Sequence, residues 1–290
     1  MILDAFEGFG AFHISEDMNY KNLPVHDLLK VLRQKGILIF RGFNIHEVRD
    51  FENLTRMFSS DFLKHGVSHR EKISADGETV GVVKGENFIS LHCEMGYSPI
   101  RPEALWLYCR KPAMLGGQTT LCNAGQYWSF LSDSTKSLFE KYQISYHHRW
   151  PEQVWKSFFK VQDITEIEKL FLLRADVKIS KFENGILEFV FTTWAMQELK
   201  NGQKMFMNSI LNMIDTKNLD LCQVTWSNGS SLGNELVDEL RRIGDFLTRN
   251  FDWCTNDVIC VDNKQVLHGR RAFQGPREVM TRFSSKLIEV

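Results

Sequence analysis

The hydrophobic pattern near the start of the chain predicts a helix, a strand and a second helix. From Pro24 to Leu32, apolar residues recur three and four positions apart, which is the spacing of one helical face. Gly36 stands where a helix C-cap is expected. The apolar run at 37–40 follows directly and has the composition of a buried strand. A second helical spacing, from Val48 to Phe58, completes the unit.

Short strand-like runs dominate the rest of the chain. The segment 62–90 is rich in Gly, Lys, Glu and His, and we interpret it as mostly loop. Strands are expected at 104–109, 118–122, 258–261 and 279–283, with a hairpin centred on 183–185. Helices are expected at 127–142, 165–173 and 232–250.

The order of these elements favours a single domain over residues 1–290. The chain has no internal repeat, no low-complexity tract and no linker-like stretch. It therefore reads as a mainly β core with flanking helices (α+β), interrupted by a mixed insertion at about 150–225. Many aromatic residues fall in that insertion, among them Trp150, Trp155, Phe158 and Phe159, and we expect them to cover a binding site.

Composition narrows the class of protein. The 290 residues include 35 Lys and Arg against 36 Asp and Glu, for a net charge of −1, which argues against a nucleic-acid partner. No stretch approaches the roughly 18 apolar residues of a membrane span. The first residues do not form a signal peptide, and the six cysteines are dispersed without a C-x-x-C pair. We expect a cytoplasmic protein with reduced thiols.

Two histidine-containing segments carry the candidate chemistry. In the first, His92 and Glu94 are two positions apart, so an extended strand would turn both toward one face, with Cys93 turned away. The second holds His268, which follows an apolar strand. Two histidines and one carboxylate on one face would form a facial triad, which leaves metal positions open and is typical of non-haem Fe(II) oxygenases.

Further segments, in the same order along the chain, resemble the TauD/TfdA superfamily of Fe(II)- and 2-oxoglutarate-dependent oxygenases. The similarity is greatest to the H-x-E branch, which includes clavaminate-synthase-like and SyrP-like amino-acid hydroxylases, and it covers about residues 22–290. The segments that carry it are the strand ending in Arg41-Gly42-Phe43, the stretch 92–99, Gly116-Gly117-Gln118-Thr119, Asp262-Asn263, His268-Gly269-Arg270 with Phe273, and Gly275-Pro276-Arg277.

The resemblance implies a fold, a metal and a cosubstrate. The fold would be a double-stranded β-helix (jelly roll) with flanking helices and a lid-like insertion. Fe(II) would be bound by His92, Glu94 and His268, and O₂ would be the second cosubstrate. The distal carboxylate of 2-oxoglutarate would be held by Thr119 and by an arginine that follows His268, because a guanidinium matches a carboxylate bidentately.

Two arginines compete for this role. Arg277 fits the G-P-R position of the family, whereas Arg282 fits members with a longer spacing. Because they are an odd number of positions apart, they face opposite sides of a regular strand, so only one should point inward. We favour Arg277, which would leave Arg282 near the substrate or on the outside. Arg270 is expected to brace the fold.

By the same resemblance, the reaction would be hydroxylation of an unactivated C–H bond coupled to oxidative decarboxylation of 2-oxoglutarate. The substrate would be a small polar molecule, with an amino acid, free or tethered to a carrier protein, as the best candidate. Halogenating relatives lack the carboxylate ligand, so Glu94 argues against halogenation. Desaturation or cyclisation by the same oxidant is the alternative within enzymes. A non-catalytic β-barrel that binds a small molecule is the alternative outside them.

Three polar residues are candidates for contact with the substrate. Asn87 lies shortly before the first metal-ligand histidine, although a turn residue after Gly85 is an equally good interpretation. His65 and His69 are spaced as on one helical face and could lie in a substrate loop. Gly66 between them weakens a helix, which argues against a second metal site.

Overall fold

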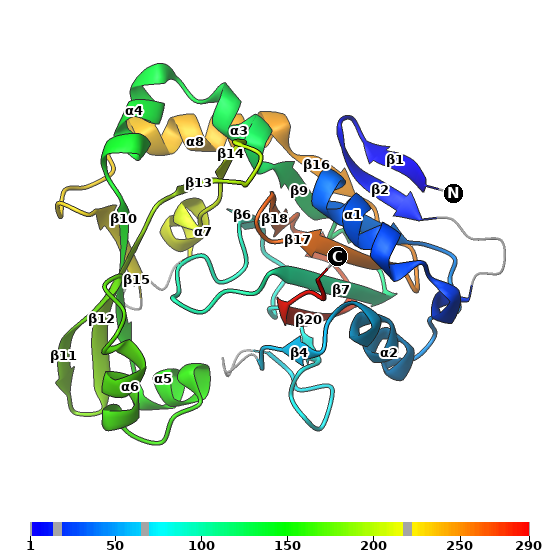
Figure 1. Ribbon diagram of the computed structural model, residues 1–290, viewed down its shortest axis with the longest axis horizontal. Coiled ribbons are helices and arrows are strands. Elements are labelled where there is room, and N and C mark those ends of the chain that lie inside the picture. The colour runs from blue at the N-terminus through cyan, green and yellow to red at the C-terminus, as the bar shows by residue number, and fades with distance from the viewer. Residues whose placement is uncertain (1, 14–18, 65–69, 217–221, 290) are drawn as a thin grey trace.

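The computed structural model describes residues 2–13, 19–64, 70–216 and 222–289. Its centre consists of two β-sheets that pack face to face, which confirms the expected mainly β architecture of the jelly-roll type (Figure 1). The larger sheet has the strand order β1 (Ile2–Phe6), β2 (Phe9–His13), β3 (Ile37–Phe40), β17 (Val258–Asp262), β7 (Ala104–Lys111), β20 (Glu278–Lys286) and β4 (Asp61–Phe62), with β5 (Val80–Gly81) also paired to β20. The smaller sheet has the order β16 (Arg249–Phe251), β9 (Thr119–Asn123), β18 (Val266–Arg270) and β6 (Ile89–His92).

Side chains alternate between the two faces along the strands of the larger sheet, so each face contributes to a different hydrophobic cluster. On β7, Leu105 and Leu107 belong to the cluster between the two sheets, whereas Trp106 and Tyr108 belong to the cluster on the outer face. Helices α1 (Val25–Lys35) and α2 (Val48–Phe58) cover that outer face and contribute Leu28, Phe51 and similar residues. The opening helix, strand and helix are therefore confirmed.

Helices also cover the outer face of the smaller sheet. The predicted helix at 232–250 is α8 (Asn234–Leu247), and its apolar face packs beside Leu91 and Leu267 of the sheet. The single helix predicted at 127–142 is wrong, because the chain forms α3 (Ala124–Phe130) and then α4 (Asp133–Lys141). Ser132 interrupts the helix, since its extended backbone and its side chain, which accepts a hydrogen bond from the Thr135 amide, form the N-cap of α4.

The middle of the chain forms a separate sheet beside the two central ones (Figure 1). Its strand order is β11 (Val177–Glu183), β12 (Ile186–Thr193), β10 (Ile144–Trp150) and β15 (Cys222–Trp226). The predicted hairpin joins β11 to β12. The remaining elements of this region are α5 (Glu152–Phe159), α6 (Ile164–Phe171), β13 (Met196–Glu198), β14 (Lys204–Phe206) and α7 (Ile210–Asp215).

The aromatic residues of this insertion form a core of their own. The Trp150 ring lies 4.8 Å from Phe158 and 5.6 Å from Phe159, centroid to centroid, and all of them are buried. Neither these residues nor Trp155 line the cavity of the candidate site described below, and the expectation that they cover a binding site stays a prediction. Helices α5 and α6 are amphipathic and need an apolar surface to pack on, and this cluster provides it.

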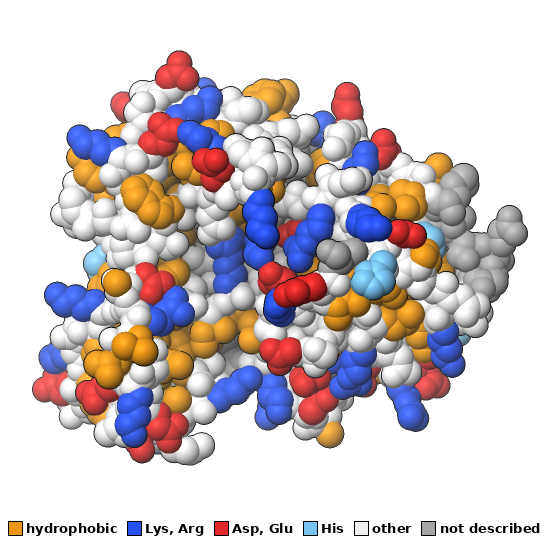
Figure 2. All heavy atoms as spheres, in the orientation of Figure 1, with side chains coloured by type: hydrophobic (Ala, Val, Ile, Leu, Met, Phe, Trp, Pro, Cys, Tyr) orange, Lys and Arg blue, Asp and Glu red, His pale blue; other side chains and the backbone are white. Residues whose placement is uncertain are grey.

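Short elements complete the structure: η1 (Tyr20–Asn22), and β8 (Leu115–Gly116) paired with β19 (Phe273–Gln274). Within the described ranges, no helix combines the length and the hydrophobicity that a membrane span requires. On the face shown in Figure 2, basic and acidic side chains are interspersed rather than segregated, in keeping with the near-zero net charge.

Candidate active site

The two histidines are brought together by the pairing of β18 with β6. His268 is the direct antiparallel partner of His92, and their ring centroids are 4.3 Å apart. Glu94 lies beside them, with its Oε2 atom 3.4 Å from Nε2 of His268. One donor atom from each of the three residues lies within 4.8 Å of the others, so they can hold one metal ion.

Glu94 reaches this position from a turn and not from the strand that the spacing suggested. Strand β6 ends at His92, and Met95 has a left-handed backbone with φ of 56°. The buried Asn263 side chain fixes the turn: the Glu94 amide donates to its Oδ1 (2.8 Å), and its Nδ2 donates to the Glu94 carbonyl (3.0 Å). The Asp262-Asn263 motif therefore has a physical role in holding Glu94 beside the two histidines.

The protonation states suit metal binding. The Nδ1 atom of His92 lies 2.8 Å from the Ser90 carbonyl, which can accept its proton and leave Nε2 free as a ligand. Burial, with His268 nearby, lowers the pKa of His92 to about 3, so the ring is neutral at physiological pH. Burial alone would raise the pKa of Glu94, but Arg70 and the two histidines outweigh it and hold that pKa well below its usual range.

The donor set fits Fe(II). Two imidazoles and one carboxylate at one point are the facial triad of non-haem iron oxygenases, which leaves positions open for other ligands. The hydrogen bond from His92 to a backbone carbonyl is the kind of contact that orients a metal-bound histidine.

The three residues face a cavity of about 930 Å³ between the two central sheets. The apolar part of its wall comes from the larger sheet, with Leu105, Leu107 and Val279. Another part of the wall comes from the insertion, through Asn212 and Met213 of α7. The volume lies within the range of about 300–1,000 Å³ that is usual for small-molecule sites.

Thr119 and Arg277 line the same cavity. Arg277 is largely buried, and within the described part of the chain its Nε atom has no hydrogen-bond partner. Burial, with Arg270 nearby, lowers the pKa of Arg277 to about 10, so it remains a cation at neutral pH. The Thr119 hydroxyl accepts a hydrogen bond from Trp253 Nε1 (3.1 Å), which leaves its own proton available to a ligand.

The approach of Arg277 to this wall depends on the Gly116-Gly117 turn. Both glycines have positive φ, of 72° and 74°. A Cβ atom on Gly116 would lie 2.1 Å from the Ala272 carbonyl oxygen, and one on Gly117 would lie 3.3 Å from Cδ of Arg277. The turn therefore requires glycine at both positions.

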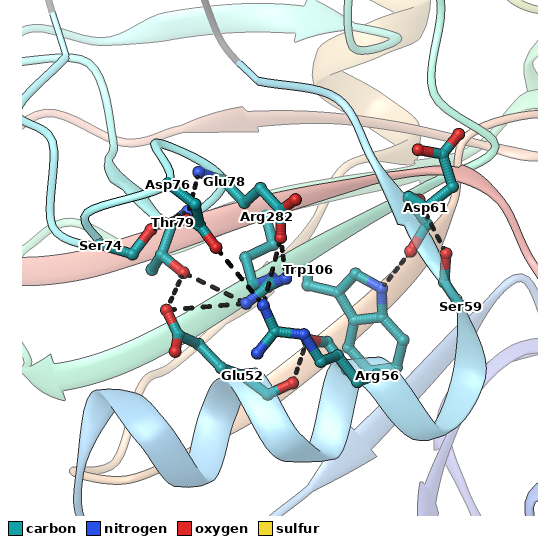
Figure 3. A network of polar contacts seen from close by, with 12 residues as sticks. Glu52, Arg56, Ser59, Asp61, Ser74, Asp76, Glu78, Thr79, Trp106 and Arg282 are labelled. Atoms are coloured by element: carbon teal, nitrogen blue, oxygen red, sulfur yellow. Dashed lines mark hydrogen bonds and ion pairs between the residues drawn. The ribbon is translucent and has the colours of Figure 1, made fainter.

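Arg282 faces the other side of the larger sheet, as the spacing of the two arginines predicted. It is fully buried under α2, where its Nη2 lies 2.8 Å from Glu78 Oε2 and its Nη1 lies 3.7 Å from Glu52 Oε1 (Figure 3). Its guanidinium also stacks over the Phe62 ring, 4.0 Å from the centroid. Arg282 does not line the cavity.

The other candidate residues have different outcomes. Asn87 lines the cavity, and its backbone carbonyl accepts a hydrogen bond from Arg270 (2.8 Å). Arg270 also donates to the carbonyls of Val83 and Gly85, so it braces the loop that precedes β6, as expected. His65 and His69 lie outside the described residues.

Sequence reasoning missed Arg70 and the residues of α7 in the cavity wall. Arg70 lines the cavity, with an Nη2 atom 3.5 Å from Glu94 Oε1. The start of helix α7 is hydrogen-bonded to the turn that carries Glu94, because the Cys93 amide donates to the Asn208 carbonyl (3.0 Å) and the Ser209 hydroxyl donates to the Cys93 carbonyl (2.9 Å). In the sequence, Arg70 directly follows His69, a candidate for contact with the substrate, and this neighbour could have drawn attention to it.

Comparison with known proteins agrees with this geometry. A model of the family described as "Taurine catabolism dioxygenase TauD, TfdA family" matches residues 7–283. The dapdiamide synthesis protein DdaC of Enterobacter agglomerans is 22% identical over 275 residues, covering 88% of this chain and 83% of its own. The clavaminate synthase-like protein At3g21360 of Arabidopsis thaliana is 25% identical over 276 residues, with the same coverage of 88% and 83%. The structure of a taurine dioxygenase from Burkholderia xenovorans has the same fold, with a TM-score of 0.65 at 13% identity over 100% of this chain and 90% of the other.

Proposed function

The chain belongs to the taurine catabolism dioxygenase TauD, TfdA family, and on this premise we propose that it hydroxylates an unactivated C–H bond of a small polar substrate. It is an Fe(II)- and 2-oxoglutarate-dependent oxygenase. The substrate class in the proposal is an amino acid, free or tethered to a carrier protein. The overall change is substrate plus 2-oxoglutarate plus O₂ to hydroxylated substrate, succinate and CO₂.

One observation carries the proposal: the His92, Glu94 and His268 cluster opens into the same cavity as Thr119 and Arg277. In the proposal, the three clustered residues hold Fe(II). Bound there, the iron would supply the oxidation chemistry, in which one oxygen atom enters the substrate and the other enters succinate.

The remaining residues bind and orient the cosubstrate. Arg277 offers a buried guanidinium whose Nε has no partner among the described residues, and Thr119 offers a hydroxyl proton beside it. Together they suit the distal carboxylate of 2-oxoglutarate, whose other end would face the metal. Leu105, Leu107 and Val279 give the cavity an apolar wall, which would limit the contact of bound cosubstrate with water.

Two features support a small, polar substrate from specialised biosynthesis. The cavity is large enough for the cosubstrate and a second small molecule, and polar groups such as Asn87 and Asn212 line it beside the apolar wall. One relative is named for dapdiamide synthesis and another is named as clavaminate synthase-like.

The test is a screen for substrate-dependent succinate. The protein is loaded with Fe(II) without oxygen, mixed with 2-oxoglutarate and each L-amino acid, free or as a carrier-bound thioester, and then exposed to O₂. We expect succinate in equal amount to a product that gains one oxygen atom. A product that loses two hydrogen atoms would replace hydroxylation by desaturation or cyclisation, and ligand binding without succinate would favour a binding protein.

His92→Ala is the negative variant for this screen, and His26→Ala is its matched control, because His26 is exposed on α1. Succinate formation that survives His92→Ala would contradict the assignment of the metal ligands.

A further inference from the structure

Arg70 is a cation in the cavity besides Arg270 and Arg277, and the only role given to it above is its ion pair with Glu94. Its side chain is only 10% exposed, and its guanidinium stacks over the Phe283 ring, 5.3 Å from the centroid. We propose that Arg70 binds a carboxylate of the substrate, so that the substrate carries a free acid group. This inference rests on the proposed function and narrows its substrate class.

The hydrogen-bonding capacity of Arg70 is largely unused. A guanidinium has five N–H donors. In the described part of the chain, Arg70 has one ion pair, to Glu94 at 3.5 Å, and its buried Nε atom has no partner. Burying a charged group with unpaired donors is unfavourable, so a ligand that supplies two acceptor oxygens would be bound well there.

A bound metal ion would weaken the attraction between Arg70 and Glu94, which is the one ion pair that Arg70 makes among the described residues. Glu94 is one of the three residues that can hold the ion, and coordination would draw on its negative charge. In the loaded site, the charges of Fe(II) and 2-oxoglutarate would cancel. The two carboxylates of the lining, Glu94 and Asp215, are then outnumbered by its four cations, Arg70, Lys84, Arg270 and Arg277. The cavity therefore keeps an excess of positive charge, which an anionic substrate would reduce.

Arg270 does not alter this conclusion. It also lines the cavity, but both of its terminal nitrogens already donate to backbone carbonyls, those of Val83, Gly85 and Asn87, and only its Nε lacks a partner among the described residues. Asp215, at the end of α7, pairs with Arg241 at 2.6 Å and also accepts a hydrogen bond from Ser90. Arg270 therefore has less free hydrogen-bonding capacity than Arg70, and the carboxylate of Asp215 is already paired with other residues.

Arg70 and Arg277 have different neighbours, so they can serve different ligands. Arg277 stands over Phe273, 5.5 Å from the ring centroid, on the wall that contains Thr119. Arg70 stands over Phe283 beside Glu94. If 2-oxoglutarate runs from Arg277 to the metal, Arg70 is available for a second molecule that reacts near the metal.

The fold holds Arg70 in place from the opposite side of the larger sheet. Arg70 directly precedes a short hairpin over 71–81, in which the Gly81 amide donates to the Glu71 carbonyl (2.8 Å). Arg282 donates hydrogen bonds to two residues of that hairpin, Glu78 (2.8 Å) and Thr79 (3.4 Å) (Figure 3). The Thr79 hydroxyl in turn donates to Glu52 of α2 (2.7 Å). Arg282 is therefore a positioning residue for the segment that begins at Arg70.

A carboxylate at Arg70 would separate the two substrate forms in the proposal. A free amino acid keeps its carboxylate, whereas an aminoacyl group on a carrier has converted it to a thioester. The inference therefore favours a free amino acid, or another compound with a free acid, over a carrier-tethered group.

The experiment compares wild type with Arg70→Gln and Arg70→Lys, each loaded with Fe(II) and 2-oxoglutarate. Every L-amino acid is offered as the free acid, the α-carboxamide and the pantetheine thioester, and succinate is measured. Arg149→Gln is the matched control, because Arg149 is exposed and pairs with Glu188 on the surface of the insertion. Iron content and succinate formed without substrate are measured in the same samples.

We expect wild type to use one acid about 10- to 100-fold better, as kcat/KM, than its amide or thioester. Arg70→Gln should lose that preference, Arg70→Lys should keep part of it, and Arg149→Gln should keep all of it. Equal use of acid and amide by wild type, an unchanged preference in Arg70→Gln, or no stimulation by any acid would overturn the inference.

The failure of this inference can be told apart from the failure of the proposed function. If wild type forms succinate without any preference for acids, only the role of Arg70 is wrong. If wild type forms no succinate under any condition, the proposed function itself is wrong. Loss of iron from Arg70→Gln, with the acid preference of its remaining activity intact, would show that Arg70 positions Glu94 and does not bind substrate.

Discussion

His268 lies directly opposite His92 across the antiparallel pair of β18 and β6, with the two ring centroids 4.3 Å apart. Directly opposed residues of an antiparallel pair project to the same face, so this register turns both imidazoles toward the cavity. A shift of one residue in the register of this pairing would turn one imidazole to the other face and separate the two histidines. The cluster of His92, Glu94 and His268 therefore depends on one strand pairing between distant parts of the chain.

Replacing His268 by alanine should abolish iron binding with little loss of stability. The substitution removes one of three ligands but leaves the strand pairing of β18 intact, because that pairing uses backbone groups. Iron content after gel filtration and the thermal unfolding midpoint are the measurements. The exposed His26→Ala should retain both, and full iron content in His268→Ala would contradict the ligand assignment.

Arg277→Gln should raise the KM for 2-oxoglutarate by about 10- to 100-fold, because it removes a charge-assisted pair with the distal carboxylate. Activity at saturating cosubstrate should recover in part, since the metal ligands are unchanged. Steady-state kinetics with varied 2-oxoglutarate measures the effect. Arg242→Gln, on the exposed side of α8, should leave this KM unchanged, and an unchanged KM in Arg277→Gln would rule out the proposed role.

Arg282→Gln should have the opposite profile. The substitution leaves Glu78 and Glu52 without their buried cation, and breaking a buried pair from one side costs about 3 kcal/mol. We therefore expect a lower free energy of unfolding in denaturant titrations but an unchanged KM for 2-oxoglutarate. A large rise in that KM at full stability would show that Arg282, and not Arg277, binds the cosubstrate.

Asn263→Ala should weaken both the fold and the metal site. The Asn263 side chain accepts from the Glu94 amide and donates to the carbonyls of Glu94 and Pro102, and all of these contacts are buried. Leaving such groups unpaired costs about 1–3 kcal/mol each. Iron titration and chemical denaturation measure the two effects. A variant that unfolds more easily yet binds iron normally would show that the turn does not depend on Asn263 to present Glu94.

The sequence pattern predicted two features correctly: the elements at the start of the chain and the opposite orientations of two arginines. The helix, strand and helix at the start follow from the spacing of apolar residues. The odd separation of Arg277 and Arg282 correctly predicted that only Arg277 faces the cavity. Arg277 directly precedes β20, and the residues of β20 from Val279 to Phe283 alternate between the two faces of the larger sheet. Whether Arg277 binds the cosubstrate remains a prediction.

Features set by contacts between distant residues were not accessible from the pattern. Glu94 sits in a turn because Asn263, from another part of the chain, pins its backbone. The break at Ser132 depends on a single capping hydrogen bond within an otherwise helical composition. Arg282 anchors the hairpin that follows Arg70 from the other side of the sheet. The residues in this contact are far apart in the sequence, so the spacing of neighbouring residues could not predict it.

The central claim, that this cavity couples 2-oxoglutarate oxidation to substrate hydroxylation, is tested most directly with isotopically labelled dioxygen. Fe(II)-loaded enzyme is given 2-oxoglutarate and the best substrate from the screen, and both products are analysed by mass spectrometry. The account predicts one labelled oxygen atom in succinate and one in the product, in equal amounts, with both lost in His92→Ala. Succinate formed without labelled product in wild type, or labelled product in His92→Ala, would contradict it.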